Sequence, residues 1–181
     1  MIEKTAEAIL EAAFSVFDDT PTATLTDVAA EAGVGRATLH RHFSGRDELL
    51  TAMAIQAMRE LDDVFETAAA EAETYTEALR LGMAAMIPLA NRAHFLEDWP
   101  SVNSPALAAE TERQKHEMIH AIEQAKSEGG FAPDVPSAWI AQSFDALLFA
   151  AWEMVKSEDA TPKQAADLAW RTLTTGVGGG K

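Results

Sequence analysis

Apolar residues recur at the spacing of an α-helix along almost the whole chain, while the alternating pattern of a half-buried β-strand is almost absent. This periodicity predicts an all-α protein. Proline and glycine, which interrupt helices, divide the pattern into segments. We therefore expect helices over residues 5–17, 25–32, 36–43, 47–72, 76–92, 106–128, 137–156 and 162–175.

Two of the expected helices, 25–32 and 36–43, are short and are separated by a turn that contains Gly33. Thr24 and Asp27 stand at the positions of a capping box, which satisfies backbone N–H groups at a helix start. Two short helices joined by a glycine-containing turn are typical of a helix-turn-helix motif. In that motif the N-terminal end of the second helix enters the major groove of DNA.

The net charge of the whole chain is unfavourable for DNA binding, but the charge of one short segment is favourable. The chain carries 29 acidic and 14 basic side chains, a net charge of −15, and an acidic surface repels the phosphate backbone. Residues 34–46, however, contain three arginines, two histidines and no acid. Because this window covers the second short helix, charge and local structure together indicate DNA binding.

Several classes of protein are excluded by what the sequence lacks. It has no cysteine, which excludes disulfides, thiolate metal sites and cysteine nucleophiles. No run of about 18 apolar residues is present, so no segment is expected to cross a membrane. The first residues lack the basic stretch and apolar core of a signal peptide, so we expect a cytoplasmic protein.

The N-terminal segment also carries four short motifs in a fixed order and spacing. They are residues 9–13 (ILEAA), 24–29 (TLTDVA), 32–43 (AGVGRATLHRHF) and 46–50 (RDELL). In these motifs the first 50 residues resemble the DNA-binding domain of the TetR (tetracycline-repressor-like) transcriptional regulators. The resemblance implies a three-helix helix-turn-helix domain over residues 1–46. It also implies a C-terminal helical ligand-binding and dimerisation domain over residues 47–181.

The resemblance implies roles for individual residues of the DNA-binding domain. Phosphate contacts are implied for Thr26, Thr38, His40, His42 and Arg46, and contacts to base edges for Arg36, Ala37 and Arg41. Arginine can donate two hydrogen bonds to guanine, so Arg36 is expected to contribute most to specificity. The family usually has tyrosine at the position of His40, so the operator sequence stays open.

The helix expected over residues 137–156 is apolar on more than one side, so it needs packing partners on more than one side. In a chain of this size we expect the second apolar face to meet another subunit. The resemblance implies a four-helix interface, built from this helix and the helix over 162–175 of each subunit. The expected interface residues are Trp139, Ala146, Phe149, Ala150, Leu168 and Leu173. A symmetric homodimer would place two recognition helices about one DNA turn apart, on a palindromic operator.

An effector pocket inside the helical body is a further implication of the resemblance. Its candidate lining residues are large apolar side chains: Met83, Met86, Ile87, Phe95, Trp99, Met118 and Phe144. Methionine and aromatic side chains line adaptable pockets, although they also fill ordinary cores. The expected partners are therefore an operator DNA duplex, a small-molecule effector and a second copy of the chain, without a cofactor.

One motif allows a different interpretation. Residues 116–120 read HEMIH, which has the H-E-x-x-H spacing of helical zinc sites in which two histidines hold the metal. On a helical wheel, however, His116 and His120 lie far from the apolar stripe centred on Met118, which directs them to solvent. We therefore assign no catalytic residue and no metal ligand. A helical small-molecule- or zinc-binding protein with a purely structural helix-turn-helix is kept as the alternative function.

The favoured interpretation is a ligand-responsive DNA-binding transcriptional regulator. We expect a repressor that leaves its operator when a small molecule binds the body, because a ligand that favours one of two conformations shifts their populations. The long helix expected over residues 47–72 would transmit this change between the two domains.

Overall fold

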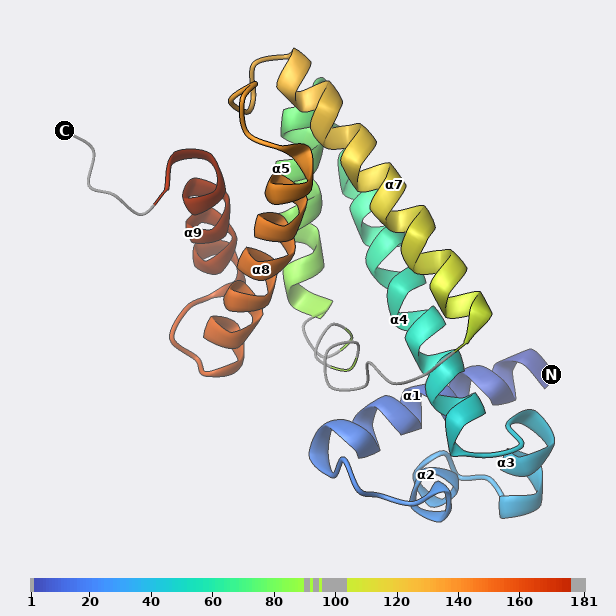
Figure 1. Cartoon of the computed structure of the whole chain (residues 1–181). Coiled ribbons are helices and arrows are strands. Elements are labelled where there is room, and N and C mark those ends of the chain that lie inside the picture. Colours follow the sequence, from blue (N-terminus) through green and yellow to red (C-terminus); the bar gives the residue numbers. More distant parts are fainter. Residues whose placement is uncertain (1, 90–91, 93–94, 96–103, 177–181) are drawn as a thin grey trace. The chain divides into compact units, whose positions relative to one another are not determined.

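The computed structural model describes residues 2–89, 92, 95 and 104–176, and every regular element in this part of the chain is helical (Figure 1). The all-α prediction is thus confirmed. None of the described helices combines the length and the apolar composition that a membrane span needs. The elements are α1 (Ile2–Asp19), α2 (Leu25–Glu31), α3 (Arg36–His42), α4 (Arg46–Ala69), α5 (Tyr75–Met86), η1 (Ile87–Leu89), α7 (Pro105–Ser127), α8 (Ser137–Lys156) and α9 (Pro162–Thr175).

The predicted helix boundaries agree with the structure most closely where local signals are strong. α8 and α9 begin and end at the predicted residues, because Pro136 and Pro162 mark their starts. α1 is longer than the predicted range 5–17, whereas α4 begins and ends earlier than the predicted range 47–72. The helix predicted over 76–92 ends as an α-helix at Met86 and continues as the 3-10 turn η1, since Pro88 lacks a backbone N–H donor.

The chain forms two compact units, and each is described by itself. The first unit comprises Met1–Arg59 with Asn91–Glu110, and the second comprises Glu60–Ala90 with Thr111–Lys181. Helices α4 and α7 therefore contribute residues to both units. The first unit extends beyond the predicted domain boundary at residue 46, because Leu49, Leu50 and Met53 of α4 complete its core.

The core of the first unit draws on α1, α2, α3 and α4. Its most deeply buried side chains include Ile9 and Phe17 of α1, Leu39 of α3, and Leu49 and Met53 of α4. Full burial of one such side chain contributes about 1.5–3 kcal/mol to stability. Since Leu39 is the buried residue of α3, it is the main apolar attachment of this short helix.

A buried cation also belongs to the first unit. Arg92 is 8% exposed, and its guanidinium carbon lies 3.9 Å from the centroid of the Phe14 ring. Arg92 Nη2 donates to Glu11 Oε1 at 2.7 Å and to Glu11 Oε2 at 2.8 Å. Because the carboxylate compensates the buried charge, the ion pair fastens Arg92 to α1.

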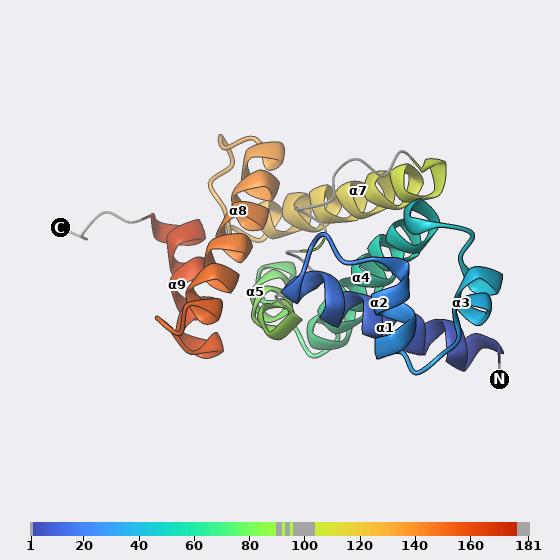
Figure 2. The ribbon, with the colours of Figure 1, turned by 90° about the horizontal axis from the view of Figure 1, so that it is seen from below.

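In the second unit α8 and α9 lie side by side (Figures 1 and 2), and η1 packs against both. The indole Nε1 of Trp152 in α8 donates to the buried backbone carbonyl of Met86 at 3.1 Å. At the start of α5, the Glu128 carboxylate accepts from the backbone N–H groups of Tyr75 and Thr76 at 3.1 and 3.2 Å. These contacts satisfy polar groups at both ends of α5.

Candidate nucleic-acid interface

The start of α2 is held by a capping box, as predicted. The backbone N–H and the hydroxyl of Thr24 both donate to Asp27 Oδ2 at 2.7 Å, and the Asp27 N–H donates to Thr24 Oγ1 at 3.3 Å. These reciprocal bonds satisfy N–H groups that a helix start leaves without a partner. They define the residue at which α2 begins.

The turn between α2 and α3 depends on a glycine. Gly33 has a φ of +65° and donates its N–H to the Ala30 carbonyl at 3.1 Å, while the Val34 N–H donates to the Ala29 carbonyl at 2.9 Å. This pair of bonds is a Schellman motif. Glycine adopts the left-handed conformation without the steric penalty of a Cβ atom. The turn therefore directs the chain from α2 into α3 as the sequence predicts.

Helix α3 presents most of its side chains to solvent. Leu39 is buried, whereas the exposed residues are Arg36, Ala37, His40 and Arg41, and the half-buried ones are Thr38 and His42. The Arg41 Nη2 donates to Thr38 Oγ1 at 3.1 Å. On α2 the predicted DNA contact Thr26 is half-buried. The exposed face of α3 thus carries positive charge and no acid, as DNA binding requires.

Asp27 is an acid that acts on this face electrostatically. Hydrogen bonds from the backbone and hydroxyl of Thr24, together with the charge of Arg36, hold the pKa of Asp27 below its ordinary value. On the other side of α3, the backbone N–H and hydroxyl of Ser44 donate to Glu48, which lowers the pKa of Glu48. Both carboxylates are therefore ionised at neutral pH; Asp27 is engaged at the start of α2, and Glu48 is engaged with the turn between α3 and α4.

Arg46 makes hydrogen bonds and a ring contact within the first unit. Its guanidinium donates through Nη2 to the Pro21 carbonyl at 2.8 Å and through Nη1 to the Ala23 carbonyl, and it lies 4.5 Å from the centroid of the Phe17 ring. Arg46 thereby joins the start of α4 to the turn between α1 and α2. The phosphate contact that the resemblance implies for Arg46 stays a prediction.

The predicted effector-contacting residues are divided between the two units. Met83, Met86, Ile87 and Phe144 are buried in the second unit, and Met118 is half-buried there. Phe95 belongs to the first unit, where its ring meets that of Phe14 edge-on at a centroid distance of 5.4 Å. Trp99 lies outside the described residues. The buried set in the second unit stays a prediction for the effector pocket.

The predicted dimer face is the exposed side of α8 and α9. Trp139 is 65% exposed and Leu168 is 37% exposed, which is unusual for such large apolar side chains. The remaining predicted interface residues are exposed or half-buried, namely Ala146, Phe149, Ala150 and Leu173. The structure therefore places an incompletely covered apolar surface where the sequence predicts the second subunit.

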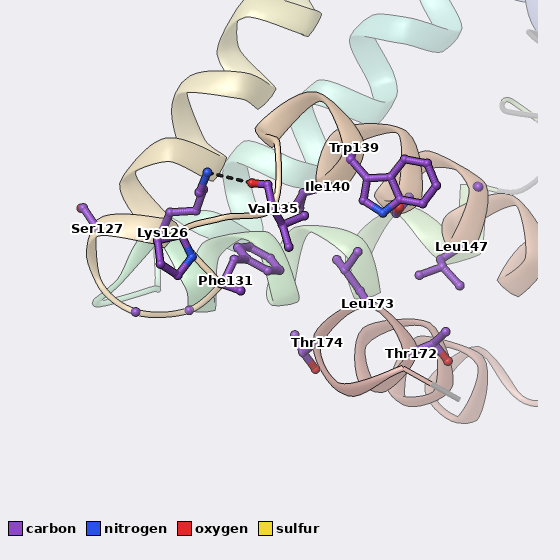
Figure 3. A pocket seen from close by; sticks show the side chains of 16 residues that line it. Lys126, Ser127, Phe131, Val135, Trp139, Ile140, Leu147, Thr172, Leu173 and Thr174 are labelled. Atoms are coloured by element: carbon purple, nitrogen blue, oxygen red, sulfur yellow. Dashed lines mark hydrogen bonds between the residues drawn. The ribbon is translucent and has the colours of Figure 1, made fainter. Parts of the chain in front are cut away.

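A groove of about 920 Å³ opens on the same surface of the second unit (Figure 3). Its walls come from the turn between α7 and α8, from α8 and from the end of α9. Phe131, Trp139, Leu147 and Leu173 lie around it. At one edge the Lys126 Nζ donates to the Val135 carbonyl at 2.8 Å. None of the described effector candidates lines this groove, whereas three of the predicted interface residues do: Trp139, Ala146 and Leu173.

The H-E-x-x-H histidines are on the surface. His116 and His120 are both exposed on α7, as the helical wheel predicts, and the His120 ring meets the edge of the Tyr75 ring at a centroid distance of 6.2 Å. Within the described residues no three histidine or acidic side chains are grouped so that they could hold a metal ion.

Sequence analysis did not single out one acid of the second unit. Asp145 is exposed as a whole residue, but neighbouring protein atoms desolvate its carboxyl, which raises the pKa to about 6. The sequence feature that could have identified Asp145 is its position, because this acid interrupts the otherwise apolar stretch 144–152 of α8. A carboxylate with an unfavourable environment for its charge is a candidate partner for a cation.

Comparison with known proteins agrees with this geometry. A model of the family described as bacterial regulatory proteins, tetR family, matches residues 9–53. The chain is 34% identical over 177 residues to the HTH-type transcriptional repressor LfrR of Mycolicibacterium smegmatis. The aligned residues cover 97% of this chain and 91% of LfrR. The crystal structure of the TetR-like regulator LfrR from Mycobacterium smegmatis in complex with proflavine has a TM-score of 0.83, with 31% identity and 98% of each chain covered.

A more distant structure shares the fold. The crystal structure of AibR in complex with isovaleryl coenzyme A and operator DNA has a TM-score of 0.81 at 20% identity, covering 94% of this chain and 98% of AibR. The likeness to LfrR extends the resemblance from the DNA-binding segment to almost the whole chain. The chain therefore belongs to the TetR family, and it is a DNA-binding transcriptional regulator.

Proposed function

We propose that this protein is a homodimeric repressor that binds a palindromic operator and leaves it when a small molecule occupies the second unit. The observation that carries the proposal is the exposed, acid-free face of α3 on an otherwise acidic chain. A net charge of −15 disfavours DNA as a bulk partner, so binding depends on this local surface. The proposed activity is binding and release in the cytoplasm, with no reaction catalysed.

In the proposed complex the start of α3 enters the major groove. Arg36 and Ala37 lie in its first turn and are exposed, so they are positioned to meet base edges. Thr38 and His40 follow in the same helix and would contact phosphates, as would Thr26 of α2. A symmetric dimer would present two such helices to two half-sites, which is why the operator is expected to be palindromic.

For the effector we propose a planar aromatic cation. LfrR, the relative at 34% identity, has been crystallised with proflavine, which is a molecule of this class. A cation beside Asp145 would offset the unfavourable environment that raises the pKa of this carboxyl to about 6. The buried aromatic and methionine side chains of the predicted pocket would contact the ring system.

The proposed effector response is a population shift. If the effector binds more tightly to a conformation that cannot span both half-sites, it lowers operator affinity by the ratio of its two affinities. By the same linkage, operator DNA weakens effector binding by an equal factor. This reciprocity distinguishes a regulator from a protein that binds the two ligands independently.

The test is fluorescence anisotropy on labelled duplexes from beside the gene, with a scrambled duplex as the control. We expect tight, salt-dependent binding to the native duplex at two protomers per site, and release when proflavine is added. Arg36→Ala should lose preference between the duplexes. Equal affinity for both duplexes at every salt concentration, also after selection from a random duplex pool, would contradict the proposal.

A second experiment tests the effector class. Proflavine fluorescence should report saturable binding that is weaker at pH 5 than at pH 7.5, because protonation of Asp145 removes the charge that attracts the cation. Asp145→Asn should bind more weakly and lose most of this pH dependence. Binding that is equally strong in Asp145→Asn would remove Asp145 from the proposed site while leaving operator binding intact.

A further inference from the structure

The side chain that stands out on the surface of the second unit is Trp139. It is 65% exposed, the largest value among the exposed large apolar residues of the described chain, and it lies in the first turn of α8. Transfer of an exposed indole ring from water into an apolar site is strongly favourable in free energy. A complex in which a partner covers Trp139 would therefore be strongly stabilised.

A receptor for such a side chain lies beside it. The groove of about 920 Å³ has apolar walls from Phe131, Ile140, Leu147 and Leu173 (Figure 3). Phe131 is itself held in place by an edge-on contact with the Trp170 ring at a centroid distance of 6.2 Å. Polar groups at the edge include the hydroxyls of α9 residues Thr172 and Thr174, which an indole N–H could reach.

Symmetry identifies the occupant of the groove. In a dimer with a two-fold axis the same surface of both subunits meets itself, so each subunit presents both the tryptophan and the groove. The groove is continuous with the predicted dimer face, because Trp139, Ala146 and Leu173 belong to both. A second copy of this chain therefore offers a side chain whose apolar character matches the groove walls.

We propose that Trp139 of each subunit inserts into the groove of the other subunit and is the principal anchor of the homodimer. This inference rests on the homodimer of the proposed function and names the contact that holds it. Buried tryptophans that fill a pocket dominate the binding energy of many interfaces, while the surrounding residues contribute little. Trp139 then carries more of the dimer affinity than the rest of the α8–α9 face.

The first test measures the dimer dissociation constant by analytical ultracentrifugation. Trp139→Ala should weaken dimerisation by at least about 30-fold, the loss typical of a binding hot spot. Leu168→Ala is the matched control, because Leu168 lies in α9 and is exposed but does not line the groove. We expect this control to weaken dimerisation by less than about tenfold. Helical content measured by circular dichroism should be unchanged in both variants, since neither side chain is buried.

The second test uses complementary variants. Ser143→Trp places a bulky side chain in the groove wall and keeps Trp139, whereas Trp139→Ala lacks the tryptophan and leaves the groove open, wider by the loss of its own indole. Each variant alone should dimerise poorly. When the two are mixed, Trp139 of the first can enter the open groove of the second, so differently labelled subunits should form mixed dimers in preference to either homodimer. Mere loss of folding in either variant would not produce this preference.

The outcomes separate this inference from the proposed function. If the unaltered chain is monomeric at all concentrations and on operator DNA, the proposed homodimer is wrong, and the proposed role of Trp139 as its anchor is overturned as well. If the unaltered chain dimerises and Trp139→Ala dimerises equally well, only the anchor is overturned. Equal losses in Trp139→Ala and Leu168→Ala, without preferential mixed dimers, would also overturn it. A selective loss with recovery in the mixture supports it.

Discussion

Replacing Arg46 by alanine tests whether this arginine holds the first unit together or contacts DNA. Its guanidinium donates to the carbonyls of Pro21 and Ala23 and stacks on Phe17 at 4.5 Å. The bond to Ala23 is part-buried and the bond to Pro21 is exposed, so each contributes about 1 kcal/mol or less, below the range for buried charged bonds. The stacked cation adds about 0.5–1 kcal/mol. Arg46→Ala should therefore lower the free energy of unfolding by about 2–3 kcal/mol.

The salt dependence of DNA binding separates the two roles. Each phosphate neutralised by the protein contributes about −0.9 to the slope of log K against log salt concentration. Because Arg46 is engaged with backbone carbonyls, its removal should leave this slope unchanged even where affinity falls. Arg41→Ala is the control with the same change of charge on the exposed face of α3. We expect it to weaken DNA binding while the free energy of unfolding stays within about 0.5 kcal/mol of the unaltered value.

The assay combines urea unfolding, followed by circular dichroism, with anisotropy titrations of an operator duplex between low and physiological salt. Affinities are compared only where each variant is fully folded. An unaltered free energy of unfolding together with a slope less steep by about 0.9 would contradict the structural role of Arg46. That result would mean that Arg46 leaves the carbonyls and contacts a phosphate, as the resemblance to the family implies.

Three further predictions concern specificity, pH and the turn. Arg36→Ala should reduce discrimination between operator and mismatched duplexes by about 1–3 kcal/mol, measured by competition, and equal losses on all duplexes would assign Arg36 to phosphates. Since the folded pKa of Asp145 is about 6, above its ordinary value of 3.8, the folded state binds more protons between these values and stability falls as pH rises through them. Solvent screening reduces this change in the free energy of unfolding to about 1 kcal/mol. The change should be absent when Asp145→Asn is unfolded in urea at the same pH values. If the variant and the unaltered chain have identical pH profiles, Asp145 is not the group that causes the change. Gly33→Ala should lower the free energy of unfolding by about 1–2 kcal/mol, because Gly33 has a φ of +65°. Gly35→Ala is the control and should have little effect, since Gly35 has a φ of −73° and open space around it. Similar losses of stability in both variants would exclude backbone strain as the cause.

The helix-turn-helix could be predicted from sequence because its determinants are local. Thr24 meets Asp27 three residues later, and the Gly33 turn closes on carbonyls of α2 within five residues. The capping box of α9 joins Thr161 to Gln164 in the same way. Such contacts depend on neighbours along the chain, so residue types and spacing suffice to predict them. The acid-free window is contiguous as well, so its charge could be read directly.

The sequence also predicted burial without identifying the partner. Phe95 is buried as its apolar character suggests, but it packs against Phe14 in the first unit, whereas the other described effector candidates belong to the second unit. Apolar periodicity shows which face of a helix is covered, while the identity of the covering residues depends on how distant segments meet. The interface and pocket residues therefore stay predictions to be tested.

The helices, the helix-turn-helix motif and the family can be predicted from the sequence, because they depend on short-range patterns and contiguous motifs. The groups that Arg46 and Arg92 bind, and the groove beside Trp139, become visible only when the helices are packed. Arg92 pairs with Glu11 across 81 positions of the chain, and the groove combines the α7–α8 turn, α8 and α9. Such arrangements arise when separate helices pack, and local spacing carries no information about them.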